Sequence, residues 1–128
     1  MGKGFKLYKT RDFIRKSEDG LMNLNLSLKI VRELAEAANF HTEHNILIDV
    51  RDTTGMLDID DLFRVIIEFL RHKDIFRNKI AILMPTDEER LWQAKRACSA
   101  LANQNFTINY FVRYEDAIDW FSIITDFS

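Results

Sequence analysis

Apolar residues recur three or four positions apart in four stretches of the chain, which is the spacing of helices with one buried face. These stretches cover residues 24–38, 59–70, 91–101 and 117–124. We expect the first helix to end near Asn39 and the second to start behind Asp58. The apolar face of the second helix is predicted to comprise Ile59, Leu62, Phe63, Ile66 and Leu70.

Two runs between these helices, residues 46–50 and 79–84, are almost continuously apolar, as in strands that are covered on both faces of a parallel sheet. Residues 107–112 are a third candidate strand. Strands that alternate with helices predict an α/β domain built from right-handed crossovers. We therefore expect one domain over residues 1–128, with a mixed, mostly parallel sheet of about four or five strands and about four flanking helices.

The N-terminal 20 residues are predicted to form a basic strand pair, from residues 5–8 and 12–16, followed by a turn at Glu18, Asp19 and Gly20. Residues 1–16 contain six Lys and Arg against one Asp. Such a segment is able to contact an acidic partner, a membrane surface or nucleic acid. We favour a solvated edge strand, because charge on an edge strand also prevents aggregation.

Composition is typical of a soluble globular domain, with 47% hydrophobic and 30% charged residues among 128. The single cysteine, Cys98, excludes an intrachain disulfide and indicates a reducing compartment. No apolar run approaches the ~20 residues that span a bilayer, and no signal-peptide pattern occurs. We expect a cytoplasmic protein without integral membrane association. The acidic remainder of the chain argues against nucleic acid binding.

The most informative segment is residues 45–62, where an apolar strand leads into a polar turn and then into an acidic helix start. Open α/β sheets place their working surface at the carboxyl ends of the strands. We therefore predict a binding or regulatory surface composed of Asp49, Arg51, Asp52, Thr53, Thr54, Gly55 and Asp58, with Thr86 and Asp87 from the end of the next strand.

Asp49 lies inside a mostly apolar strand, where a carboxylate must be paired or hydrogen-bonded. Strand alternation places Asp49 and Arg51 on the face opposite to Ile48, so Arg51 or the threonine groups are its expected partners. We favour a structural role for Asp49 over a role as a functional acid. Thr86 and Glu89 are predicted to form a capping box at the start of the third helix.

Several acidic residues gather at this predicted edge, and converging carboxylates are able to hold Mg²⁺. Most of them fall in first helical turns, where they are explained by the helix dipole. The three histidines, His41, His44 and His72, lack the spacing of a zinc site. We predict no metal and no cofactor. Cys98 lies on an apolar helix face and is expected to be a buried small hydrophobe.

The motifs ILIDVRDTTGMLDIDDL at residues 46–62, KIAILMP at 79–85 and NYFVRYEDAIDWF at 109–121 occur in the order found in one family. Over residues 40–121 the chain resembles the SpoIIAA-like branch of the STAS/Sec14-type α/β domains. The resemblance implies a regulatory or protein-interaction domain that is controlled by phosphorylation of a Ser or Thr near the helix start. The nearest matches to that position here are Thr53 and Thr54.

We therefore predict a non-enzymatic interaction module that binds a protein partner or forms a homodimer. Trp92, on the shoulder of its helix, and Trp120 are candidate interface residues, as Trp is enriched in interfaces, although local packing explains them equally well. One alternative is a carrier of a small apolar ligand or lipid, related to Sec14-like domains, which requires a sizeable apolar pocket. The other is an enzyme that uses Asp49 or Asp52 as an acid or base, which requires a raised carboxylate pKa.

Overall fold

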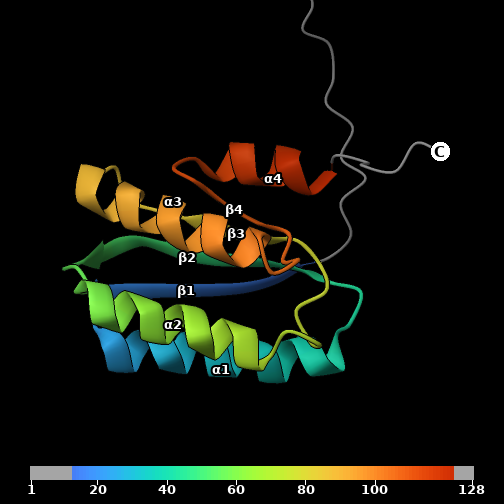
Figure 1. The fold of residues 1–128 in the computed structure, drawn as a ribbon. Helices are drawn as coiled ribbons and strands as arrows, with labels where there is room; N and C mark the ends of the chain where they lie inside the picture. Colours follow the sequence, from blue (N-terminus) through green and yellow to red (C-terminus); the bar gives the residue numbers. More distant parts are fainter. Residues whose placement is uncertain (1–12, 123–128) are drawn as a thin grey trace, which may run out of the picture.

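The computed structural model describes residues 13–122, and in this part of the chain four strands alternate with four helices (Figure 1). This alternation confirms the predicted α/β class. No helix in the described part is long and apolar enough to cross a membrane. The elements are β1 (Phe13–Leu21), α1 (Leu24–Phe40), β2 (Asn45–Thr54), α2 (Ile59–Arg71), β3 (Ile80–Leu83), α3 (Glu88–Ala102), β4 (Ile108–Phe111) and α4 (Tyr114–Ser122).

The four described strands form one sheet in the order β1-β2-β3-β4, and every neighbouring pair is parallel. Because each connection advances in the same direction with a right-handed crossover, α1, α2 and α3 lie on one face of the sheet. The last helix, α4, lies on the other face (Figure 1). The antiparallel strand expected at residues 5–8 lies outside the described residues.

The predicted turn at Glu18, Asp19 and Gly20 is wrong, because β1 continues through these residues to Leu21. The ten-residue strand β2 keeps them in the ladder, with Asp19 opposite Asp52 and Gly20 opposite Thr53. Glu18 is also held by Lys16, whose Nζ lies 3.0 Å from its Oε2. A long parallel neighbour has therefore overridden the local turn propensity of these residues.

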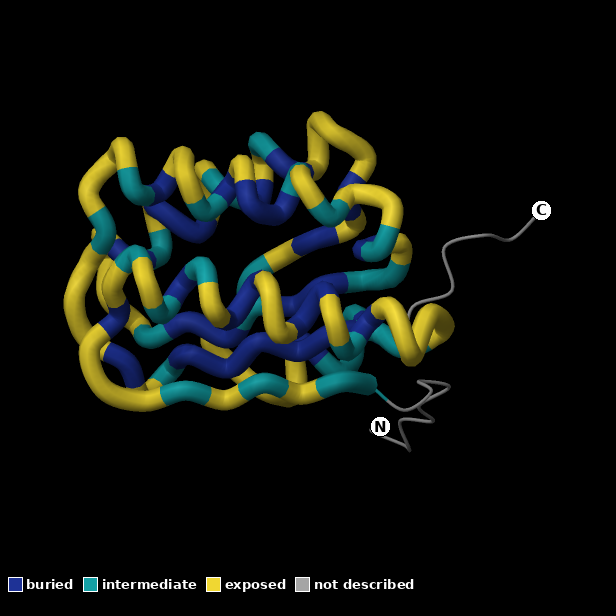
Figure 2. Tube along the Cα trace, turned by 90° about the horizontal axis from the view of Figure 1, so that it is seen from below, coloured by how far each residue is buried: buried dark blue, intermediate teal, exposed yellow. Residues whose placement is uncertain are grey.

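The main core lies between the sheet and the three helices α1, α2 and α3, as the buried segments in Figure 2 show. β2 contributes Ile46, Ile48 and Val50 to this face, as strand alternation predicted. Each such side chain contributes about 1.5–3 kcal/mol when fully buried. This core fixes the position of the strand that carries the predicted site.

The predicted apolar face of α2 is partly wrong, because Ile59 is 44% and Phe63 is 50% exposed. The predicted burial of Leu62 and Ile66 is confirmed, and the helix also buries Phe69, which was not on the predicted face. Phe63 lies at the margin of the stripe that these three residues form. Ile59 is on the same side of the helix as Ile66, but it is the first residue of α2, where Asp58 and Asp60 are exposed as well. Ile67 is 49% exposed as well, so three large apolar side chains of α2 remain accessible to solvent.

A smaller core fills the second face of the sheet under α4. Leu47, Ala81 and Leu83 from β2 and β3 pack against Ala117 and Phe121 of α4. Ala81 and Ala117 are both completely buried, and their small side chains allow α4 to approach the sheet closely. Beyond this core, the same face of the sheet carries the polar residues Arg15 of β1 and Asp49 and Arg51 of β2.

Candidate functional site

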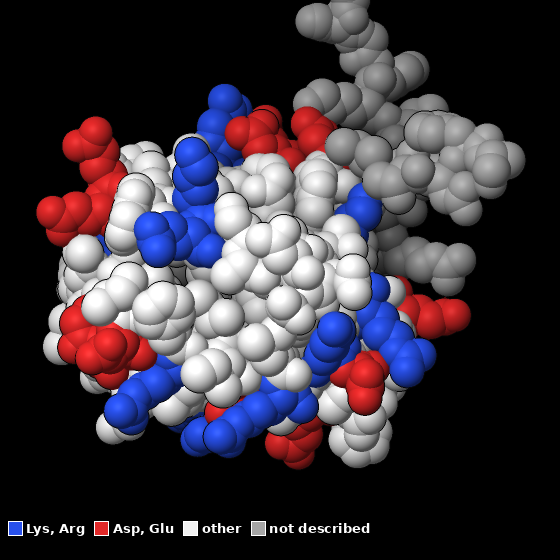
Figure 3. All heavy atoms as spheres, in the orientation of Figure 1, with Lys and Arg blue, Asp and Glu red and all other residues white. Residues whose placement is uncertain are grey.

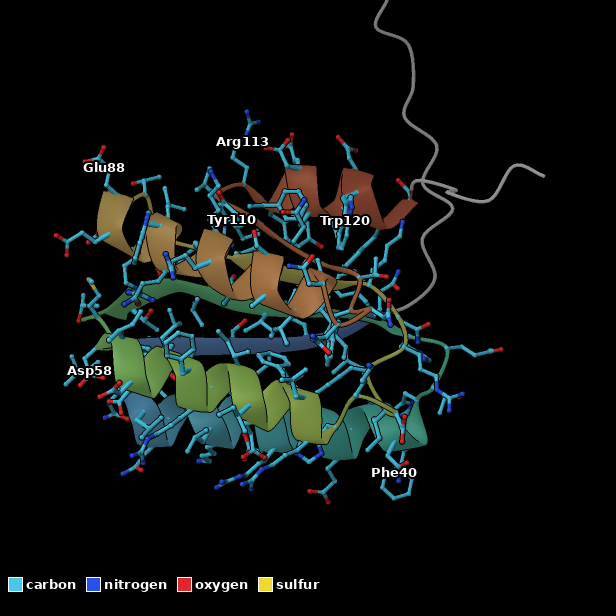
Figure 4. All side chains as sticks on the ribbon, viewed as in Figure 1. Phe40, Asp58, Glu88, Tyr110, Arg113 and Trp120 are labelled. Atoms are coloured by element: carbon cyan, nitrogen blue, oxygen red, sulfur yellow. The ribbon has the colours of Figure 1, made fainter. Side chains whose placement is uncertain are left out.

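The helices α2 and α3 both begin at the carboxyl edge of the sheet, on either side of the end of β2; Figure 4 labels Asp58 and Glu88 there. Asp58 is the N-cap of α2 and accepts a hydrogen bond from the Asp61 N–H at 2.8 Å. Asp87 caps α3 and accepts from the N–H groups of Glu89 and Arg90 at 2.9 and 3.2 Å. Each cap stabilises its helix by about 1 kcal/mol.

The predicted capping box of Thr86 and Glu89 is wrong, because the N-cap of α3 is Asp87. One residue further along the chain, the Asp87 carboxylate reaches two free N–H groups of the first turn, and its charge offsets the helix dipole. Thr86 is exposed and lies just before the cap.

β2 carries one extra residue near its end, relative to β1. Ser17 lies opposite Asp49, whereas Asp19 lies opposite Asp52, so three residues of β2 match two of β1. Such a bulge reverses the alternation of side chains beyond it. The bulge explains why Thr53 is directed to the same side as Val50, towards α3, and why Thr53 is 3% exposed.

Thr53 joins the end of β2 to the first turn of α3. Its hydroxyl donates to the Val50 carbonyl at 2.6 Å and accepts from Arg90 Nη2 at 2.8 Å, while Arg90 Nη1 donates to the Thr53 carbonyl at 3.3 Å. Burial lowers the pKa of the Arg90 guanidinium, against the opposing effect of Asp87. Thr53 is therefore part of the buried framework, whereas Thr54 is exposed.

Asp49 is held by two arginines on the second face of the sheet. Arg51 donates to the carboxylate from Nε at 3.0 Å, from Nη2 at 2.9 Å and from its backbone N–H at 3.2 Å. Arg15 of β1 donates from Nη2 at 3.0 Å and stacks on the ring of Tyr114, 5.5 Å from its centroid. The expected pairing with Arg51 is confirmed, and Arg15 adds a link between β1, β2 and α4.

The hydrogen bonds from Arg51 lower the pKa of the Asp49 carboxyl, and they outweigh the opposing effect of its burial. The same contact raises the pKa of Arg51. An acid or base working near neutral pH needs a raised carboxyl pKa, which is the reverse of the direction found at Asp49. The geometry therefore supports a structural role for Asp49, with its carboxylate ionised at neutral pH.

The turn after β2 contacts the end of β1. Gly55 has φ of +88°, and a Cβ on it would lie 2.6 Å from Leu21 Cδ1 and 3.2 Å from the Met22 carbonyl oxygen. Only glycine adopts this conformation at low cost, so the turn is able to lie directly against Leu21. Leu21, 63% exposed, and Met56, 45% exposed, are thus neighbours of the same glycine.

Exposed apolar side chains therefore surround the predicted turn. Leu21 and Met56 flank Gly55, and Ile59 and Phe63 follow on the outer side of α2. Acidic side chains at the starts of α2 and α3 lie at the same edge of the sheet, and Figure 3 shows acidic groups at this end of the molecule. We call this area, defined by Leu21, Asp52, Thr54, Met56, Asp58, Ile59 and Phe63, the carboxyl-edge surface.

Within residues 13–122, no three His, Cys, Asp or Glu side chains converge as a metal site would require. His41 and His44 contact each other, with ring centroids 5.1 Å apart, but His72 binds the buried Glu68, with 3.0 Å between Nε2 and Oε2. The carboxylates at the carboxyl edge include the caps of α2 and α3.

Cys98 lies in the main core, as its position on the helix face predicted. Burial raises the pKa of its thiol to about 12. A thiol with this pKa is almost entirely protonated at neutral pH and is a poor nucleophile.

The two tryptophans have different environments. Trp92 is half exposed on α3, and Arg96 lies over its ring at 4.7 Å from the centroid. Trp120 of α4 packs against Phe111 and Phe121, with centroids 5.6 and 5.9 Å away (Figure 4). Of the two predicted interface residues, Trp92 is the accessible one, and Trp120 is largely occupied by local packing.

Comparison with family models, with curated proteins and with solved structures finds no match to this chain. The resemblance to SpoIIAA-like domains therefore stays a prediction.

Sequence reasoning missed the residues that complete the site from other elements. Arg15 and Arg90 reach Asp49 and Thr53 across 34 and 37 positions of the chain. No local pattern marks such pairs. Leu21 and Met56 did carry a signal, since each is a large apolar residue next to a turn-forming glycine.

Proposed function

We propose that this protein is a non-enzymatic interaction module that binds a partner protein through the carboxyl-edge surface. The observation that carries the proposal is the group of exposed apolar side chains around the Gly55 turn: Leu21, Met56 and Ile59 are 63%, 45% and 44% exposed. Single exposed apolar residues are ordinary, but several at one end of a small domain are typical of an interaction site.

The charges at this surface indicate what a partner must present. Asp52, Asp58 and Asp60 are exposed beside the apolar groups, and Glu88 lies across the edge at the start of α3. A partner segment with apolar anchors and neighbouring Lys or Arg side chains complements this arrangement. A second copy of the chain is the other candidate partner, and the subunit number distinguishes the two.

Thr54 is the residue through which such a surface would be regulated. It is exposed next to Gly55, while Thr53 is buried and bonded to Arg90. A phosphate adds about −1.5 to −2 charges at neutral pH. On Thr54 it would add this charge beside Leu21 and Met56, and would weaken an interface that depends on apolar contact there.

The supporting experiment is quantitative capture of the partner by native mass spectrometry, with tagged protein expressed in its own cells. The variants Met56→Gln and Ile59→Gln are compared with Phe40→Gln, a matched control. Phe40 is 76% exposed at the opposite end of the molecule (Figure 4). We expect the first two variants to lose at least about tenfold in captured partner, since central apolar anchors contribute about 2 kcal/mol or more each.

The control should bind as the wild type does. Equal capture by all three variants would contradict the proposal, because binding would then not involve this surface. A complex that contains only copies of this chain, and that the Met56→Gln change dissociates, would assign the surface to self-association instead. Thr54→Glu should reduce capture, and Thr54→Val should not.

A further inference from the structure

A cavity of about 130 Å³ lies between the sheet and the three helices α1, α2 and α3. Its wall is mainly apolar and includes Met22, Ile30, Ile48, Leu62, Phe69 and Met84. The cavity is on the first face of the sheet, so it is separated from Asp49 and its arginines by β2. It is also distinct from the exposed side chains of the carboxyl-edge surface.

One cation is set into this apolar wall. Arg90 lines the cavity and is 5% exposed. Its guanidinium donates to the carbonyl and hydroxyl oxygens of Thr53, both uncharged, and no carboxylate of residues 13–122 lies within ion-pair distance of it. The carboxylate that acts on the pKa of Arg90 is that of Asp87, the exposed N-cap of the same helix. A buried charge without a partner of opposite sign is costly.

The guanidinium also has hydrogen-bonding capacity to spare. An arginine has five N–H donors, and the two contacts with Thr53 occupy only part of them. These contacts, together with the helix position, fix the orientation of the planar group. Gln93, which also lines the cavity, is fixed by the bond from its Nε2 to the Leu57 carbonyl. The polar part of the wall is therefore preorganised.

We propose that this cavity binds a small monocarboxylate with an apolar body, whose carboxylate pairs with Arg90. The size follows from the volume: an enclosed apolar cavity of about 150 Å³ accommodates benzene, and this cavity, about 130 Å³ and open on one side, fits an apolar body of at most one ring. The charge follows from the wall, where a single cation calls for a single negative charge. A planar carboxylate also matches the fork of a guanidinium, with which it forms two parallel hydrogen bonds. The volume is too small for the acyl chains of a lipid, so the ligand is a compact acid.

We infer that a ligand enters between α2 and α3, because Val65 of α2 and Ala97 of α3 line the cavity and are both partly exposed. Ala94 and Ala97 of α3 line the cavity, and their short side chains leave its wall thin on this side. Figure 3 shows an uncharged area at the centre of this face of the molecule, with Lys and Arg side chains around it. Arg90 is the only charged residue among those that line the cavity, so a ligand with an apolar body displaces water from no other charged group there.

The test uses the methionine methyl groups of the full-length protein as probes. Met22 and Met84 line the cavity, whereas Met56 is exposed and does not. ¹³C-methyl-methionine spectra are recorded during titration with sodium benzoate, and with benzyl alcohol as a neutral ligand of similar size. We expect benzoate to shift Met22 and Met84 but not Met56, and to bind at least about tenfold more tightly than benzyl alcohol.

Two variants separate the contributions of charge and volume. Arg90→Met should abolish the preference for benzoate, and Ala97→Phe should block both ligands by filling the cavity while Arg90 stays in place. If Arg90→Met fails to fold, the wild-type comparison and Ala97→Phe decide the question. Equal affinity for the two ligands, shifts at Met56 instead of Met22 and Met84, or no binding of benzoate at millimolar concentration would each overturn the proposal.

Discussion

Replacement of Asp49 by Asn tests whether this carboxylate organises the second face of the sheet. Asp49 accepts four hydrogen bonds, three from Arg51 and one from Arg15. Asn keeps the size of the side chain but replaces one acceptor oxygen with an NH₂ group that faces arginine donors. Hydrogen bonds to charged groups contribute about 1.5–3 kcal/mol each and are not additive. The arginine side chains are 46% and 36% exposed, so water compensates part of the loss.

We therefore expect Asp49→Asn to lower the free energy of unfolding by about 2 kcal/mol at pH 7. This corresponds to a decrease of about 1 M in the midpoint of urea unfolding. The fluorescence of Trp92 and Trp120 provides the signal. Asp52→Asn is the matched control, because Asp52 is an exposed acid on the same strand. Its effect should stay within about 0.5 kcal/mol.

The pH dependence of this difference provides a second check. The pKa of Asp49 is lower in the folded state than in the unfolded state. Its contribution to folding stability is therefore fully present at pH values above the unfolded-state pKa, and it is lost as the pH falls through the folded-state pKa. The gap in stability between wild type and Asp49→Asn should consequently narrow as the pH is lowered below about 4. A gap that is independent of pH, or no larger than that of Asp52→Asn, would refute this explanation of Asp49.

Three further predictions concern the framework around the site. Thr53→Val should destabilise the protein by about 1–2 kcal/mol in urea unfolding, because it removes the hydroxyl that accepts from Arg90 Nη2. The exposed Thr54→Val should have little effect, and equal effects of the two changes would contradict the buried contact. Gly55→Ala should lower the free energy of unfolding by about 2 kcal/mol and displace Leu21. Gly20→Ala is the control and should cost about 1 kcal/mol, because Gly20 also has a positive φ but no atom close to its Cβ position. Equal costs in urea unfolding would contradict the close contact at Gly55. Cys98 should react with a thiol reagent only after denaturation, and rapid labelling of the native protein at pH 8 would be incompatible with its burial.

The periodicity of the sequence was sufficient for much of the fold. Helical spacing and continuous apolar runs identify elements that depend on local pattern, and the face of Asp49 follows from alternation before the bulge. The same alternation fails at Thr53, because the extra residue in β2 is defined only by pairing with β1. Glu18, Asp19 and Gly20 were misassigned for a related reason, since a neighbouring strand decides their conformation.

The sequence predicted where the candidate site lies in the fold but not which residues contact one another there. The order of strand, turn and acidic helix start located the Gly55 turn and Asp58 correctly at the carboxyl edge. The exposure of Phe63 and the burial of Arg90 depend on how α2 and α3 rotate against the sheet. That rotation follows from packing between distant segments, which a single sequence does not encode as a local pattern.

The most direct test of the proposed function is a ¹³C-methyl-methionine titration of this protein with the purified partner from the capture experiment. Binding at the carboxyl-edge surface predicts a shift of the Met56 signal, with Met22 and Met84 unchanged in the core. The Phe40→Gln variant should give the same shift, and Ile59→Gln should require a higher partner concentration to reach it. An unperturbed Met56 in a saturated complex would contradict the proposal that this surface is the binding site.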